Sequence, residues 1–150
     1  MTTLFSRLKK AFPFVGERPA TEADLFAFCA ARGVEVVFAA EIRRGLYVRR
    51  EGSDYIFLNA SLLGWSLLYV LAHEIGHLLY HVPTRTRNAS FAFDGDRCRR
   101  NHVEAETAAA LLLLPVAELE RSLLAGEYKT DERLAALIGV RIDYHSKYRK

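Results

Sequence analysis

The strongest constraint on the fold is the segment Val70–His81, which reads VLAHEIGHLLYH. It places three histidines and one glutamate in an apolar helical pattern that extends from Leu62 to His81. Each polar group buried without a partner costs about 2–7 kcal/mol. Because a long apolar helix must be buried, these side chains need partners. A metal ion is one such partner, and a pair of hydrogen-bonded core histidines is the alternative.

The segment His73-Glu-Ile-Gly-His77 has the pattern HExxH. Residues four apart lie on one helix face, so His73 and His77 can hold one zinc ion. Glu74 is then placed to act as the general base, taking a proton from the attacking water and passing it to the leaving amine. A glycine inside a helix costs about 1 kcal/mol, so Gly76 predicts close packing against another element. His81 either adds a further polar group near the metal or is exposed at the helix end.

A catalytic zinc site usually has three protein ligands, so a third must come from elsewhere. The next helical run, NHVEAETAAALLLLP, carries three candidates near its start: His102, Glu104 and Glu106. His102 and Glu106 are four residues apart and share a helix face that Glu104 only partly overlaps.

The remaining pattern predicts an α+β fold with a small three-stranded antiparallel sheet packed on helices, one of them the HExxH helix. The strands are expected at 34–38, 46–48 and 55–58. Thr21 and Asp24 resemble a capping box, Gly33 a helix stop, and Ser61 a cap for the helix from 62 to 81. Further helices are expected at 21–33, 101–114, 115–126 and 131–138.

The length of 150 residues indicates one domain, 1–150. Within it we distinguish an N-terminal arm at 1–20, a long basic loop at 82–100 and a C-terminal helical tail at 130–150. We expect the arm to form a short helix packed on the domain, with a frayed terminus or membrane-surface contact as alternatives. Without a CxxC pair, signal-peptide pattern or long apolar run, the sequence predicts a cytoplasmic protein with reduced thiols and no membrane contact.

The net charge of +3 permits contact with nucleic acid without requiring it. Basic residues gather in the loop and at the C-terminus, where they usually form solvated faces; DNA contact would make binding strongly salt-dependent. These residues are Arg85, Arg87, Arg97, Arg99, Arg100, Arg141, Lys147, Arg149 and Lys150. Asp94-Gly-Asp96 is interpreted as a turn, since it lacks the spacing of a calcium loop.

HEIGH followed by EAETAAALLLLP resembles the ImmA/IrrE-type metallopeptidases, which are gluzincin-like and typically read E-x-E-A-N-x-F-A-A-x-L-L-x-P after the HExxH helix. Aligned on Pro115, Glu104-Ala105, Ala109-Ala110 and Leu112-Leu113 match this pattern. The chain departs from the pattern at three positions: His102 stands for Glu, Glu106 for Asn, and Ala108 for Phe.

The resemblance implies a minimal zincin-like domain with Zn²⁺ held by His73, His77 and Glu104, and with Glu74 as catalytic base. His102 and Glu106 remain alternatives for the third ligand. Characterised members are cytosolic zinc endopeptidases that cleave a helix-turn-helix repressor of a mobile element or stress response. The same is therefore expected here, with transcription regulation as the outcome.

Two questions stay open at this level. The oxyanion stabiliser could be Tyr144, His145 or an arginine of the 82–100 loop. The departures at His102 and Ala108 also leave room for a non-cleaving zinc-fold regulatory protein that contacts a transcription factor or DNA.

Overall fold

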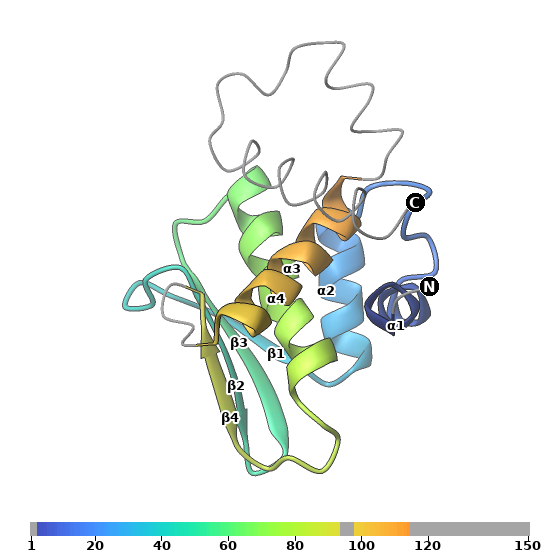
Figure 1. The fold of residues 1–150 in the computed structure, drawn as a ribbon. Coiled ribbons are helices and arrows are strands. Elements are labelled where there is room, and N and C mark those ends of the chain that lie inside the picture. Colours follow the sequence, from blue (N-terminus) through green and yellow to red (C-terminus); the bar gives the residue numbers. More distant parts are fainter. Residues whose placement is uncertain (1–2, 94–97, 115–150) are drawn as a thin grey trace.

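A computed structural model describes residues 3–93 and 98–114 of the chain (Figure 1). The elements in chain order are α1 (Thr3–Ala11), α2 (Glu22–Ala31), β1 (Glu35–Ala39), β2 (Gly45–Arg50), β3 (Ser53–Asn59), α3 (Gly64–His81), β4 (Ala89–Ala92) and α4 (Arg99–Leu113). The predicted α+β class is confirmed. The helices expected at 115–126 and 131–138, the tail at 130–150 and the turn at 94–96 lie outside the described residues.

The sheet has four strands in the order β1-β3-β2-β4, and it is mixed. β2 pairs antiparallel with both β3 and β4, whereas β1 pairs parallel with β3. The prediction of three antiparallel strands was therefore wrong in strand number and in the direction of the β1 pairing. Alternation of apolar residues locates strands but does not specify their neighbours, and here the hairpin strand β3 lies between β1 and β2.

The fourth strand lies in the segment 82–100, which was expected to be a loop. β4 pairs with β2, with Phe91 opposite Tyr47. The Arg49 side chain of β2 also donates hydrogen bonds to the carbonyl oxygens of Pro83 (3.1 Å) and Thr86 (3.3 Å), which ties the approach to β4 onto the sheet. A four-residue strand carries too little periodicity to be recognised in a sequence.

Helix α3 lies at the centre of the domain, between the sheet and α4, as Figure 1 shows. The two helices approach closely at Gly76, where an added Cβ would lie 3.1 Å from the Cα of Ala105 and 3.2 Å from the Cβ of Ala108. The predicted close packing at Gly76 is confirmed. The small side chain of Ala108 fits the same close approach, which gives this departure from the family pattern a packing reason.

The N-terminal arm packs on the domain, as predicted. Leu8 and Phe12 are buried, and the Ala20 N–H donates to the Leu112 carbonyl of α4 at 2.8 Å. Thr21 and Asp24 form the predicted capping box, while Gly33 follows α2 with a φ of 71°.

The cap predicted at Ser61 is wrong. Helix α3 begins at Gly64, and the Ser61 side chain bonds to Asn59 instead. In the part of the chain that the structure describes, no helix is long and apolar enough to span a membrane. Both cysteines are free, and burial raises the pKa of the Cys29 thiol to about 11.

Candidate metal centre

Helix α3 buries the polar face of its HExxH motif. His73, Glu74 and His77 are each 0% exposed, although they are ionisable. The rings of His73 and His77 lie one helical turn apart, with their centroids separated by 4.9 Å. The helix therefore presents two imidazoles and one carboxylate on its buried side.

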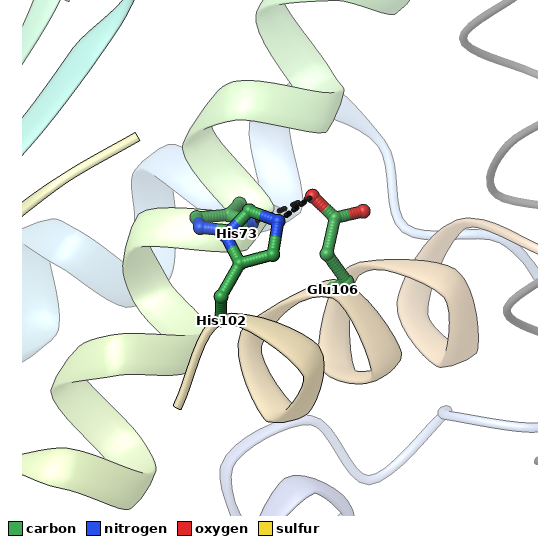
Figure 2. Close-up of side chains that lie close together, drawn as sticks. All are labelled: His73, His102 and Glu106. Atoms are coloured by element: carbon green, nitrogen blue, oxygen red, sulfur yellow. Dashed lines mark ion pairs between the residues drawn. The ribbon is translucent and has the colours of Figure 1, made fainter. Parts of the chain in front are cut away.

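Helix α4 brings two of the three candidate side chains to the same place. One ligand atom from each of His73, His102 and Glu106 lies within 4.8 Å of the others (Figure 2). Glu106 Oε1 is 3.2 Å from His73 Nδ1 and 3.6 Å from His102 Nε2. His102 and Glu106 share a helix face, so both point toward α3, as their spacing of four residues predicts.

Glu106 is held from a second side by Tyr69 of α3. The Tyr69 hydroxyl lies 2.6 Å and 2.5 Å from the two carboxylate oxygens. Burial alone would raise the pKa of Glu106, but its hydrogen bonds with His73 and Tyr69 outweigh burial and lower this pKa below the ordinary 4.5. Glu106 is thus an ionised carboxylate in a buried position.

The second motif histidine has a different neighbour. His77 Nδ1 lies 2.8 Å from His81 Nδ1, and His81 Nε2 lies 2.9 Å from Glu104 Oε1. Burial, together with repulsion from three neighbouring histidines, lowers the pKa of His77 to about 2. His77 therefore stays neutral, which is the form that binds metals.

Glu104 lies apart from the other two candidates on α4, and His81 contacts His77 in agreement with the first of its two predicted alternatives. The Glu104 carboxylate contacts His81 and, at 3.7 Å, Arg100, and it is not part of the group formed by His73, His102 and Glu106. His81 is not exposed at the helix end, because its side chain is only 4% accessible.

Aromatic side chains that sequence reasoning missed line the site. Phe91 stacks on His77 with a centroid distance of 4.5 Å, and Phe93 lies 4.6 Å from the His73 ring. Their spacing of two residues is the period of a strand face, and Tyr69 is four residues before His73 on the same helix face. Both spacings can be read in the sequence. They indicate a site only when the positions of β4 and Glu106 are known.

The general-base candidate Glu74 lies against the start of β2. A Cβ added to Gly45 would lie 3.3 Å from Glu74 Oε2 and 2.5 Å from Val70 Cγ1. The absence of a side chain at Gly45 therefore lets the sheet approach α3 at the carboxylate of Glu74. Gly45 is therefore a further residue of the site that the sequence did not single out.

Some of the predicted basic surface is neutralised by ion pairs. Arg87 pairs with Glu51 at 2.7 Å, and Arg100 lies near Glu104. The oxyanion candidates Tyr144 and His145 lie outside the described residues, as do Arg97 and the C-terminal basic residues.

The donor set fits a metal ion. Neutral imidazoles and carboxylates are the ligands of zinc and of other divalent transition metals. Here they converge from two helices, with His73 and Glu106 buried, and two of the imidazoles have a second nitrogen close to another polar group, as metal ligands usually do. The arrangement is therefore placed for metal binding.

Comparison with known protein families identifies the family of the chain. Searches for similar proteins of curated function and for similar solved structures gave no match. Residues 29–143, which are most of the chain, match a peptidase family described as the IrrE N-terminal-like domain. The match spans the sheet, the HExxH helix and α4, and it confirms the resemblance found in the sequence. The chain therefore belongs to the IrrE N-terminal-like domain family of peptidases.

Proposed function

We propose that this protein is a zinc-dependent endopeptidase. The observation that carries the proposal is the convergence of the HExxH helix with His102 and Glu106 of α4 in one group, in which His73 and Glu106 are buried, in a chain of a peptidase family. Two histidines with a neighbouring glutamate on α3 are the parts that hydrolysis of a peptide bond by activated water requires.

The ligands in this proposal are His73, His77 and His102. A ligating histidine usually donates its second N–H to a carboxylate or another acceptor, and Glu106 is in that position beside His73 Nδ1 at 3.2 Å. The Tyr69 hydroxyl engages the same carboxylate, so Glu106 acts as a positioning residue. Glu104, the ligand expected from the resemblance, is the alternative to His102.

A bound zinc ion would supply Lewis acidity, which makes water more acidic and a carbonyl more electrophilic. The chain's own contribution is the proton transfer. Glu74 adjoins His73 and is buried beside Gly45, so its carboxylate can accept the proton of the attacking water and return it to the leaving amine. The aromatic rings of Phe91 and Phe93 pack against the two motif histidines and help to fix their orientation.

The sheet supports a peptide as the substrate. Among the described strands β4 pairs with β2 alone, so its other edge pairs with none of them. Phe91 of β4 stacks on the His77 ring, which puts this edge beside the site. An extended peptide that adds to the edge as a further strand would pass the catalytic residues.

The resemblance adds a candidate substrate within this proposal. Its characterised members cleave helix-turn-helix repressors in the cytoplasm, so a repressor of that class is the first protein to test, with derepression of its genes as the consequence. Fold and motif alone do not select a substrate.

The competing function is a zinc-fold regulator that binds a transcription factor or DNA without cutting. The departure at Ala108 now supports this function less, because the close approach of α3 and α4 at Gly76 favours a small residue at position 108. The departure at His102 remains compatible with it.

The test uses the zinc-loaded full chain with a proteome-derived peptide library and with purified helix-turn-helix repressors encoded beside its gene. Mass spectrometry should detect discrete cleavage sites. Glu74→Gln should bind zinc normally and cleave at least about 100-fold more slowly, since general-base catalysis contributes about 10²–10⁴-fold. A zinc-loaded wild type that cuts neither probe would instead favour the binding function.

A further inference from the structure

A hydrogen-bonded chain connects the second motif histidine to the partly exposed rim of α4. His77 Nδ1 lies 2.8 Å from His81 Nδ1, and the opposite nitrogen of His81 lies 2.9 Å from Glu104 Oε1. The three residues come from two helices, α3 and α4. The end nearest the metal group is fully buried, while the Glu104 side chain is 31% exposed.

The chemistry of the three groups fixes the direction of these hydrogen bonds. A carboxylate only accepts, so the hydrogen between His81 and Glu104 belongs to His81 Nε2. When the ring of His81 carries this one hydrogen, its Nδ1 has a lone pair and accepts from His77. The hydrogen of His77 is therefore on Nδ1, which leaves the lone pair of His77 on Nε2.

We propose that His81 and Glu104 are positioning residues that set the tautomer and the orientation of His77 for metal binding. Without the carboxylate, His81 could carry its hydrogen on Nδ1 and donate to His77. His77 would then be protonated at Nε2 and could not offer that nitrogen to a metal. The proposal deepens the proposed function and rests on it, and it gives Glu104 a role other than that of a ligand.

Packing keeps the chain of hydrogen bonds in place. Phe91 stacks on His77 and also lies against His81, with centroid distances of 4.5 Å and 5.8 Å. Next to Glu104, Ala105 lies at the close approach of α4 to Gly76, so the backbone that carries the carboxylate is fixed relative to α3. The geometry is therefore built into the fold.

The decisive test is a double-mutant cycle on zinc affinity, measured by competition with a chromophoric chelator. His81→Asn keeps an acceptor in place of Nδ1, because Oδ1 is attached at the same carbon position, but it does not reach Glu104. We expect His81→Asn to stay within about threefold of wild type, whereas His81→Phe and Glu104→Ala should lose about 10-fold or more, as for other groups that orient metal ligands.

The proposal predicts that Glu104→Ala has no further effect in the His81→Asn background. An equal loss in both backgrounds would identify Glu104 as a direct ligand and overturn the proposal, as would full affinity in Glu104→Ala. Glu51→Ala is the matched control, because Glu51 also pairs with an arginine but lies on the exposed β2–β3 turn. It should bind zinc as wild type does.

A second readout needs no metal. Two-bond ¹H–¹⁵N spectra of the imidazoles should show His77 with its hydrogen on Nδ1 in the metal-free wild type, and a shift toward the other tautomer in Glu104→Ala. An unchanged tautomer in Glu104→Ala would contradict the proposal. A wild type with the expected tautomer but no zinc binding would refute the proposed function and leave the positioning interaction intact.

Discussion

Among the residues that the structure describes, acidic and basic side chains are buried together in a sheet cluster and in a helix cluster, and the two are built differently. In the sheet, Arg49 and Asp54 pair at 2.7 Å, and the Tyr47 hydroxyl donates to the same carboxylate; we call these three residues the sheet cluster. Between α3 and α4 lie His73, Glu74, His77 and Glu106, the helix cluster, which is also buried.

The difference lies in where the positive charge comes from. The sheet cluster contains its own cation, a guanidinium that meets the carboxylate through two of its nitrogens. The helix cluster combines two carboxylates with imidazoles, and burial keeps His77 neutral. Buried carboxylates are stabilised by a nearby positive charge, which a divalent metal would supply to the helix cluster. One cluster is thus complete as structure, and the other is arranged for a ligand.

Breaking the sheet cluster should have the largest effect on stability. Asp54→Asn removes the charge that balances Arg49, whose side chain is 9% exposed, and an unbalanced buried charge costs about 3–5 kcal/mol. Urea unfolding should show a loss near the lower end of that range, while zinc binding of the folded protein should not change. The exposed pair of Arg87 and Glu51 provides the control, because Glu51→Gln should cost less than about 0.5 kcal/mol. Equal costs would mean that burial does not distinguish the two ion pairs.

The substitution Gly45→Ala should reduce stability less than Asp54→Asn does, and it should also disturb the helix cluster. In Gly45→Ala the new Cβ would lie 2.5 Å from Val70 Cγ1 and 3.3 Å from Glu74 Oε2, and overpacking of this kind costs about 1–3 kcal/mol. Because Glu74 must shift, turnover of a cleaved peptide should fall as well. Gly52→Ala has open space around the new Cβ but a φ of 80°, so it should lose stability through backbone strain and keep its turnover. Equal turnover in the two variants would remove Gly45 from the site.

The pH dependence of stability should distinguish the two clusters. Measured over one pH unit, it is the smallest of the expected effects. Burial lowers the pKa of His77 from the ordinary 6.5 to about 2, so below pH 6.5 the unfolded chain takes up a proton that the folded chain refuses. Stability of the metal-free protein should therefore fall as pH drops from 6.5 toward 2, by up to about 1.4 kcal/mol per pH unit for this group.

The sheet cluster should affect stability at alkaline pH. Burial raises the pKa of Tyr47 above its ordinary 10, so the unfolded chain loses a proton first and stability falls above pH 10.

The prediction for His77 is tested at acid pH. Urea unfolding at pH 5, 6 and 7 should show the loss of stability in wild type and a smaller slope of stability against pH in His77→Phe. A slope that His77→Phe leaves unchanged would assign it to other groups.

Much of the fold was predictable because its signals are local. The capping box at Thr21, the stop at Gly33 and the three longer strands follow from residues near each other in the chain. The parallel pairing of β1, the strand β4 and the late start of α3 were missed, since they depend on contacts between distant segments. Gly76 is the exception, because a glycine in a long helix indicates a close neighbour without naming it.

In the site, too, the features that depend on nearby residues were predictable and those that depend on packing were not. The HExxH face follows from helical periodicity, and the candidates on α4 followed from their residue types. Which α4 side chain approaches His73 depends on the rotation of one helix against the other, and that rotation is set by the contact of Gly76 with Ala105 and Ala108. The contact of Glu104 with His81 is a consequence of this packing, which a sequence pattern does not contain.

The most direct test of the account is the metal content of the purified chain after zinc is supplied and excess removed. Elemental analysis should find about one zinc per wild-type chain and none in His73→Ala, while Asp54→Asn should keep its zinc, because the sheet cluster takes no part in binding. A wild type that stays free of metal, or a His73→Ala variant that binds as much zinc as wild type, would contradict the claim that the helix cluster is a metal site.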